Sequence, residues 1–178
     1  MREAVLDLIE KSTRQTSNKL QFFRLAFGAG GGFSAQLDVR ECEKAMRSFL
    51  SGSRVDLDWQ VNLESAPKNL VKVLLNVGLV VSESLIRGGK MKLSTEQSGN
   101  TVTVSVVGEG QRVILQKPVR EAMEGNLAEE DLDPRAAPAF LASAVAKETG
   151  GNIVVEAIGE TNIAVSATLV FPAEVNAE

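Results

Sequence analysis

The sequence offers few of the side chains that transfer protons, attack as nucleophiles or bind metal ions. It contains no histidine and one cysteine, Cys42. The lack of histidine excludes Ser-His-Asp and Cys-His catalysis within the chain, and it excludes a phosphohistidine. One cysteine without histidine also cannot supply the usual ligands of zinc. Because Cys42 falls on the apolar side of a predicted helix, we interpret it as a small core residue rather than a reactive thiol.

A run of glycines at residues 28–32 (GAGGG) is the clearest break in the sequence. A glycine-rich loop can bind a phosphate group through its backbone N–H groups. The lysine and the serine or threonine of a P-loop are missing, however, and no predicted strand precedes the run. We therefore favour a flexible linker, which would let the preceding helix and the following domain set their own angle.

Asn76 is the unusual polar residue in the longest apolar stretch, residues 70–89 (LVKVLLNVGLVVSESLIRGG). Apolar residues recur there at helical spacing around most of the circumference, which predicts a helix buried beneath other elements. Ser65 and Pro67 mark its expected start, and Gly88-Gly89 its expected end. We interpret Asn76 as a partly buried residue whose hydrogen bonds are satisfied within the fold.

Composition limits the class of protein. The chain has 178 residues, 44% of them hydrophobic, and a net charge of −4. This length suits one domain with an appendage, or two small domains. Without a long basic run, nucleic acid is not expected as a partner. No apolar run reaches the roughly 20 residues that span a bilayer, and residues 1–11 are charged and lack the apolar segment typical of a signal peptide. We expect a cytoplasmic protein with no membrane partner.

Residues 1–27 are predicted to form one long amphipathic helix. Its apolar side chains recur at helical spacing, and most of its charged side chains lie away from them. A lone helix of this kind is not stable in water, so its apolar side must pack on other helices.

The rest of the sequence alternates short helices with strands that pair as hairpins. Helices are expected at 38–50, 118–125 and 134–149, and strands at 54–61, 90–96, 101–107, 112–115, 152–158 and 163–171. Asp38 is placed to cap the first of these helices, and Ser98-Gly99-Asn100 has the composition of a turn. This order predicts an α+β fold: an α/β sandwich whose mixed, largely antiparallel sheet carries helices on one face.

Several stretches resemble known signalling proteins. LLNVGLVVSESL, a two-stranded segment ending in VVGEG, and FLASAVAKETGGNIVVEA with NIAVSATLVFP resemble the ATP-binding domain of sensor histidine kinases. More narrowly, QFFRLAFGA, SRVDLDW, LLNVGLVVSESLIRGG and DPRAAPAFLASAVAKETGG resemble ChpT-type histidine phosphotransferases. The resemblance runs from about Val5 to Phe171. It implies one long helix of a dimerisation bundle followed by a histidine-kinase ATPase-like (Bergerat-type) domain.

The function implied by this resemblance is a phosphorelay in two-component signalling. Such a protein is a homodimer that carries a phosphoryl group on a histidine of its first bundle helix. It relays the group between response-regulator receiver domains, and a hybrid sensor kinase is a further implied partner. The resemblance implies phosphotransferase activity without ATP, and therefore no cofactor.

The residues at the nucleotide site of the kinases favour a pseudo-kinase here. ATP-binding relatives carry Asp-x-Gly-x-Gly, whose aspartate accepts a hydrogen bond from the adenine amino group, and Val106 replaces that aspartate. A second glycine-rich segment is also missing, because residues 112–138 contain only Gly125. Asn76 matches the asparagine that helps to hold Mg²⁺ in active kinases. We expect no autokinase activity; an ATP-using enzyme and a structural dimerisation or docking module are the alternatives.

Candidate interaction residues all lie on the first helix. Predicted dimer or bundle contacts are Val5, Leu8, Ile9, Ser12, Leu20, Phe23 and Phe27. Predicted receiver-docking residues, on the exposed side near the base of the bundle, are Arg14, Lys19, Phe22 and Arg24. Phe23 and Phe27 have the alternative of packing on the chain's own C-terminal part. We divide the chain into a helix with its linker (1–32), a degenerate kinase-like domain (33–172) and a tail (173–178).

The family's histidine-bearing helix has no counterpart in this sequence. Met1 already belongs to the helical pattern. No serine, threonine, aspartate or asparagine caps the start of this helix, although helices usually begin at such a residue. We therefore expect a truncated form, in which a helix with a His-Asp pair precedes Met1. A naturally histidine-free relative that docks response regulators is the alternative.

Overall fold

The computed structural model describes residues 2–28 and 36–171, and its helices confirm the expected order. The long first helix is α1 (Arg2–Ala26). It is followed by α2 (Val39–Leu50), α3 (Lys68–Ser84), α4 (Lys117–Met123) and α5 (Ala137–Glu148), with 3₁₀ turns η1 (Glu129–Asp131) and η2 (Pro134–Ala136) before α5. Within the described ranges, no helix combines the length and the apolar character that crossing a membrane requires.

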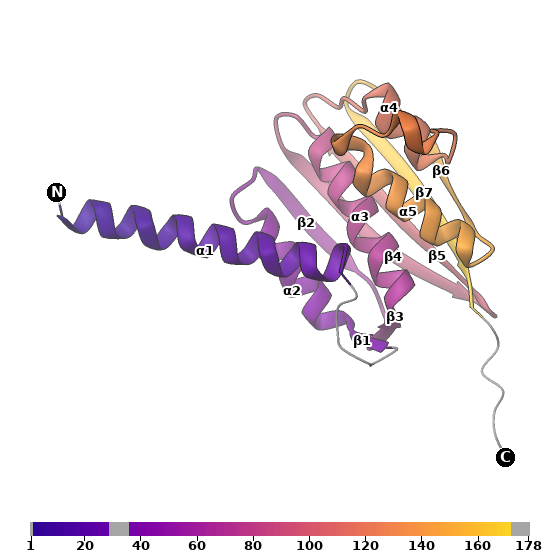
Figure 1. Cartoon of the computed structure of the whole chain (residues 1–178), viewed down its shortest axis with the longest axis horizontal. Helices are drawn as coiled ribbons and strands as arrows, with labels where there is room; N and C mark the ends of the chain where they lie inside the picture. The colour runs from indigo at the N-terminus through magenta and orange to yellow at the C-terminus, as the bar shows by residue number, and fades with distance from the viewer. Residues whose placement is uncertain (1, 29–35, 172–178) are drawn as a thin grey trace, which may run out of the picture.

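A five-stranded mixed sheet forms the centre of the α/β domain (residues 36–171), as expected. The strands are β2 (Val55–Gln60), β4 (Gly89–Ser98), β5 (Thr101–Gly110), β6 (Asn152–Ile158) and β7 (Asn162–Val170), in the spatial order β2-β4-β5-β7-β6. Only β2 and β4 pair in parallel, with α3 as the connection between them. Helices α3, α4 and α5 lie over one face of the sheet (Figure 1).

Two further strands differ from the prediction. β1 (Gln36–Asp38) and β3 (Ser65–Pro67) pair in antiparallel fashion, just before α2 and α3 respectively. The Asp38 carboxylate accepts a hydrogen bond from the Arg40 N–H at 2.8 Å, which confirms the predicted cap of α2. Three-residue strands with proline and aspartate in them carry too little periodicity to be recognised in a sequence.

Helix α3 is the central buried element, as its apolar circumference predicts. Leu70, Leu74 and Val77 are buried, as are most of its other residues. At Gly78, a Cβ atom would lie 2.5 Å from the Met46 Cε atom and 3.1 Å from a Leu93 methyl group. Gly78 therefore lets α3 pack closely between α2 and the sheet.

Two predictions for the chain after α3 are wrong: the end of the helix and the short strand at 112–115. α3 ends at Ser84 rather than at Gly88-Gly89. The Ser84 carbonyl accepts a hydrogen bond from the Ile114 N–H at 2.9 Å, and Leu85 and Val113 form an isolated antiparallel bridge. The chain after α3 is thus held by the segment predicted as a strand, and neither segment forms a longer ladder.

Both predicted hairpins are present. Strands β4 and β5 turn at Gly99, which has a positive φ of 58°, and β6 pairs with β7 with a register shift between Val155 and Ala157. The helix expected at 134–149 is interrupted near its start. Its first residues form η2, capped by Asp133, and α5 continues from Ala137.

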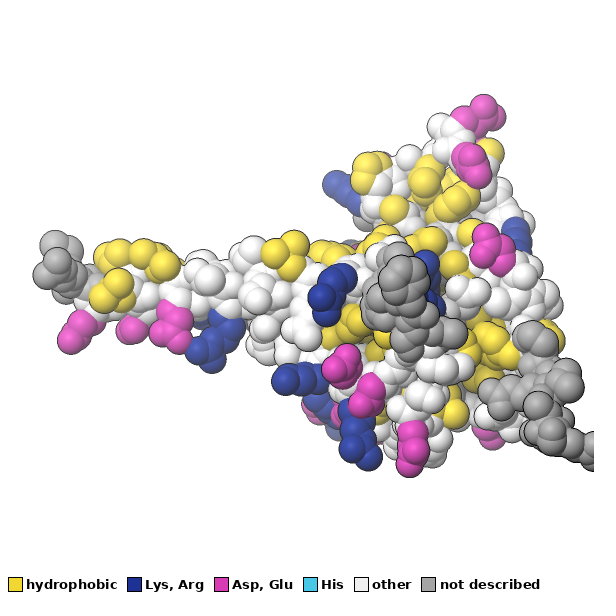
Figure 2. Space-filling model, turned by 60° about the horizontal axis from the view of Figure 1, so that its bottom comes forward, with side chains coloured by type: hydrophobic (Ala, Val, Ile, Leu, Met, Phe, Trp, Pro, Cys, Tyr) yellow, Lys and Arg dark blue, Asp and Glu magenta, His cyan; other side chains and the backbone are white. Residues whose placement is uncertain are grey.

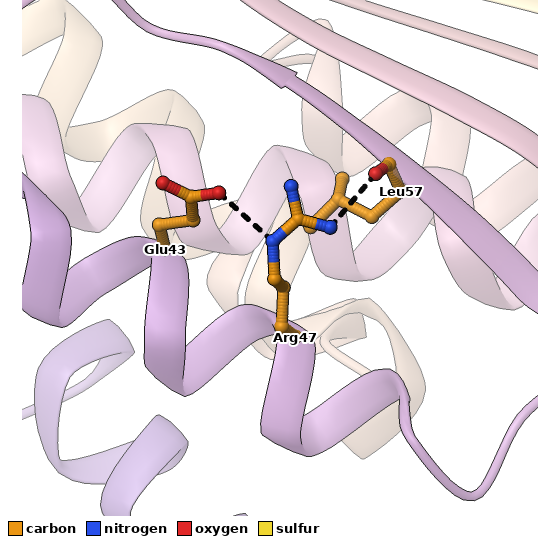
Figure 3. Close-up of polar contacts among 3 residues, drawn as sticks. All are labelled: Glu43, Arg47 and Leu57. Carbon is orange, nitrogen blue, oxygen red and sulfur yellow. Dashed lines mark hydrogen bonds and ion pairs between the residues drawn. The ribbon is translucent and has the colours of Figure 1, made fainter.

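Strand β2 lies at one edge of the sheet and is held there by helix α2. The Arg47 guanidinium donates a hydrogen bond from Nη1 to the Leu57 carbonyl of β2 at 3.0 Å. Its Nε donates to the Glu43 carboxylate of the same helix at 2.8 Å, which holds the guanidinium in place (Figure 3). Arg47 therefore binds the backbone of an edge strand, where unpaired carbonyl groups otherwise face solvent.

Candidate functional site

Helix α1 projects from the α/β domain and is the most exposed element of the fold (Figure 1). Residues 3–17 are all exposed, whereas the last turns are partly buried. At 1.5 Å per residue, the exposed part extends for about 22 Å. A helix this exposed has a free surface along most of its length.

One side of α1 is apolar. We call Val5, Leu8, Ile9, Ser12, Leu20, Phe23 and Phe27 the apolar stripe; all seven are exposed to solvent, with Leu8 at 65% and Leu20 at 66%. Figure 2 shows apolar side chains along one side of this helix and charged side chains on the other. Leu6, which is outside the predicted set, is exposed beside them. The role of the stripe as a dimer interface stays a prediction.

The base of α1, from Phe22 to Phe27, packs against α2 and α3. Phe22 is 0% exposed, and its ring stacks on Phe49 of α2 with centroids 4.3 Å apart. The prediction that Phe22 lies on an exposed docking side is therefore wrong. The sequence places Phe22 and Phe23 side by side, and only the position of α2 decides which of the two is buried.

Phe23 and Phe27 are the partly exposed aromatic residues at this base, at 38% and 37%. Phe23 lies edge-on to Phe49, with ring centroids 5.8 Å apart, and Phe27 lies 5.7 Å from Phe23. The pair thus contacts the protein on one side and faces solvent on the other. The alternative that both rings pack on the chain's own C-terminal part is met in part.

The predicted docking cations are exposed but do not share one face of α1. Arg14 forms an ion pair with Glu10 at 2.6 Å. Lys19 and Arg24 are exposed as well. With 3.6 residues per turn, five-residue steps turn the side chains by about 140°, so Arg14, Lys19 and Arg24 point in three directions. Of these, Lys19 lies nearest to the apolar stripe.

Asn76 connects α3 to the end of α1. Its Nδ2 atom donates one hydrogen bond to the Ala26 carbonyl at 2.7 Å and another to the Lys72 carbonyl at 2.8 Å. The residue is fully buried rather than partly buried, and its Oδ1 atom has no hydrogen-bond partner among the described residues. The expectation of a fully satisfied amide is therefore wrong for the oxygen.

This contact also bears on the predicted linker. Residues 29–35 lie outside the described part of the chain, so most of the glycine run is not described. The helix before it is nevertheless held against the domain, through Asn76 and through an Asn18 Nδ2 hydrogen bond to the Ser48 carbonyl at 3.3 Å. The expectation that helix and domain set their own angle is not met by these contacts.

A cavity of about 500 Å³ opens beside the base of α1. We call it the base groove; its walls come from the end of α1 (Phe23 and the following Phe27), from α3 (Leu79, Val80, Glu83, Ser84) and from Ile86, Ile114 and residues near α4 and η2. Partial burial raises the pKa of the Glu83 carboxyl. Sequence reasoning missed this groove because its walls come from segments far apart in the chain.

The remaining candidate groups are buried. Val106, at the position where ATP-binding relatives carry aspartate, is buried between Leu93 and Val165 of the neighbouring strands. Cys42 is buried and its thiol donates to the Asp38 carbonyl at 3.4 Å, which confirms a core residue. Across the described ranges, no group of acidic or cysteine side chains is placed to hold a metal ion.

Comparisons with known proteins agree on one relationship. The profile of the histidine phosphotransferase C-terminal domain matches residues 39–161. The chain is 28% identical over 158 residues to the protein phosphotransferase ChpT of Brucella abortus (strain 2308), covering 89% of this chain and 76% of that protein. A solved bacterial phosphotransferase superposes with a TM-score of 0.81 at 28% identity, covering 93% of this chain and 79% of the other.

Histidine kinases share the fold at lower similarity. The nucleotide-free catalytic domain of histidine kinase ThkA superposes with a TM-score of 0.53 at 17% identity, covering 76% of this chain and 93% of the other. Together with the sheet order, this confirms the predicted kinase-like α+β architecture.

Proposed function

The chain belongs to the histidine phosphotransferase family, and we propose that its helix α1 joins two copies and docks response-regulator receiver domains at its base. The family relationship makes the chain a phosphorelay protein of two-component signalling. Receiver domains are the partners of such a relay. We propose that two surfaces of α1 carry out the role of this chain in the relay: one binds a second copy of the chain, and the other binds a receiver domain.

The part of the apolar stripe from Val5 to Leu20 supports the dimer, whereas Phe23 and Phe27 at the base of α1 belong to the proposed docking surface. Val5, Leu8 and Ile9 lie on the part of α1 that has no cover from the α/β domain. A contiguous exposed apolar surface of this kind marks a protein interface. Ser12 and Thr16 lie at the middle of the helix, and the Thr16 hydroxyl already donates to the Ser12 carbonyl at 2.9 Å. Small side chains at these positions allow a second helix to approach closely.

The half-exposed rings of Phe23 and Phe27 above the base groove are the observation that supports docking. A groove of about 500 Å³ with mainly apolar walls accommodates side chains of a partner protein. Lys19 lies one turn before Phe23 and is exposed, so a cation borders the aromatic pair. Receiver docking is thus assigned to Lys19, Phe23 and Phe27, with Arg14 and Arg24 outside the contact.

The phosphoryl acceptor of the family is a histidine. None of these 178 residues can take that role, because the sequence contains no histidine. A phosphoramidate on imidazole cannot form on these residues. We place the acceptor imidazole outside them, and the dimer and docking surfaces within them. A hybrid sensor kinase is the proposed source of the phosphoryl group.

Binding of purified receiver domains, measured by isothermal titration calorimetry, tests the docking surface. Phe23→Ala should weaken binding about tenfold, since partly buried aromatic residues dominate protein interfaces. The matched control is Lys92→Glu, an exposed residue on β4 away from α1. Equal affinities of wild type and Phe23→Ala would contradict the assignment. If wild type binds none of the receivers of the source organism, the proposed docking function itself fails.

A further inference from the structure

We propose that Asn76 is a positioning residue that fixes the direction of α1 relative to the α/β domain and thereby holds the base groove in shape. The importance of that direction for receivers rests on the proposed function, whereas the fixing itself does not. This role uses hydrogen bonds within the chain alone, so it differs from that of the matching asparagine in active kinases.

The hydrogen bonds of Asn76 determine how its side chain is oriented. Both acceptors of its Nδ2 atom are backbone carbonyls, one on Ala26 of α1 and one on Lys72 of α3. Turning the amide over would place Oδ1 against these two oxygens, which cannot donate. The amide can therefore take only the orientation that reaches α1.

The burial of Asn76 gives this contact its strength. Asn76 and Ala26 are both 0% exposed, so water does not compete for the Ala26 carbonyl. That carbonyl lies in the last turn of α1, where carbonyl groups lack partners within the helix. The Asn76 amide replaces such a partner and at the same time joins α1 to α3, through two residues that are 50 positions apart in sequence.

A small rotation at this contact has a large effect at the far end of α1. The exposed part of the helix is about 22 Å long, so a rotation of about 10° moves its first turn by about 4 Å. A displacement of this size is enough to break the side-chain contacts of an interface. The angle at the base of α1 therefore decides where the apolar stripe lies.

The same rotation changes the base groove, because its walls belong to different elements. Phe23 belongs to α1 and Phe27 follows its last residue, while Leu79 and Val80 belong to α3, three and four residues after Asn76. Asn76 joins these two walls at their common end. A variant without the bond to Ala26 should leave the groove with walls at variable separation.

The sharpest variant is Asn76→Ser. In the same helix, the Ser84 hydroxyl donates to the carbonyl four residues earlier, Val80, at 2.8 Å. A serine at position 76 can bond the Lys72 carbonyl in the same way but is too short to reach Ala26. The matched control is Ser82→Ala, which removes a buried hydroxyl of α3 that donates to the Leu79 carbonyl at 2.8 Å and does not line the base groove. Asn76→Ala serves as a second variant.

Pulsed electron paramagnetic resonance tests whether Asn76 fixes the direction of α1. It measures the distance between spin labels attached at Lys11→Cys and Glu96→Cys in a Cys42→Ala background. The labelled protein is diluted with unlabelled protein, so that only distances within one chain are measured. We expect a narrow distribution for wild type and Ser82→Ala, and a broader or shifted one for both Asn76 variants. Thermal unfolding checks that each variant is folded. If Asn76→Ser is folded and its distance distribution equals that of wild type, the proposal is overturned. If only Asn76→Ala folds, its distance distribution is compared with wild type in the same way.

Receiver affinity distinguishes the two proposals. If wild type binds a receiver, Asn76→Ser should weaken binding about tenfold, as expected for losing one buried hydrogen bond that positions the groove. Unchanged affinity with a broadened distribution would overturn the role of Asn76 in holding the groove. If no receiver binds wild type, the docking function fails while the distances still decide whether Asn76 fixes α1.

Discussion

The rings of Phe22 and Phe49 stack with their centroids 4.3 Å apart and an angle of 27° between their planes. Phe22 belongs to α1 and Phe49 to α2, so this pair attaches the projecting helix to the α/β domain. Leu25 and Ala26 extend the attachment, since both are buried beside it. The base of α1 is thus part of the hydrophobic core, although the rest of the helix is exposed.

Phe22→Ala should therefore destabilise the fold. Replacing a buried phenylalanine by alanine costs about 3–5 kcal/mol, from lost burial and from the cavity left behind. Phe23→Ala, one position further along and partly exposed, should cost clearly less. The free energy of unfolding from urea titrations checks both values. Equal losses in the two variants would mean that the Phe22 ring is not the one held in the core.

Leu8→Asp should reduce self-association. A carboxylate in the middle of the apolar stripe has to be desolvated when a second helix packs on it, and burying an unpaired charge is costly. Size-exclusion chromatography with light scattering measures the mass. Asp7→Ala is the matched control, since Asp7 is the preceding residue and belongs to the charged side of α1. A dimer that persists in Leu8→Asp would exclude the stripe as the interface.

Cys42 should make the fold less stable at alkaline pH. Burial raises the pKa of its thiol to about 12 from the ordinary value of 9.0, and the Glu41 and Asp38 carboxylates add to the rise. Because the unfolded chain releases this proton first, the stabilisation is complete below pH 9 and is lost as the pH rises towards 12.

At pH 10 this loss is about 1.4 kcal/mol, the free energy of one pKa unit. Urea titrations at pH 7 and pH 10 should show a fall in stability that is larger by this amount in wild type than in Cys42→Ala. Other groups that titrate over the range cancel in the comparison. Parallel falls in the two proteins would mean that the thiol is accessible to water in the fold.

The fold could be predicted because its main elements have strong periodicity. Helix α3 and the hairpins β4–β5 and β6–β7 are indicated directly by the apolar pattern and the turn residues. The parallel pairing of β2 with β4 could not be predicted, because the pattern of a short strand does not tell its partner. The absence of ATP binding, argued from Val106, remains a prediction that titration with ATP and Mg²⁺ would test.

The candidate site could be predicted in part. The apolar stripe is indicated by helical spacing, and its side chains are exposed in the single chain. The base groove and the bond from Asn76 to Ala26 depend on how α1 lies against α3, which spacing along one helix does not contain. Phe22 illustrates the limit: at the level of one helix it differs from Phe23 by a single position, and tertiary packing reverses their expected roles.

Arg47→Ala should expose the edge strand β2. In the wild type, Arg47 donates to the Leu57 carbonyl at 3.0 Å while Glu43 holds the guanidinium at 2.8 Å (Figure 3). Losing this bond should lower the free energy of unfolding by about 1 kcal/mol. It should also raise association between sheet edges, because unpaired strand edges bind other strands.

Light scattering in the Leu8→Asp background separates this association from contacts of α1. Arg40→Ala, an exposed arginine of the same helix, is the control, and equal scattering from the two variants would show that Arg47 does not protect the edge.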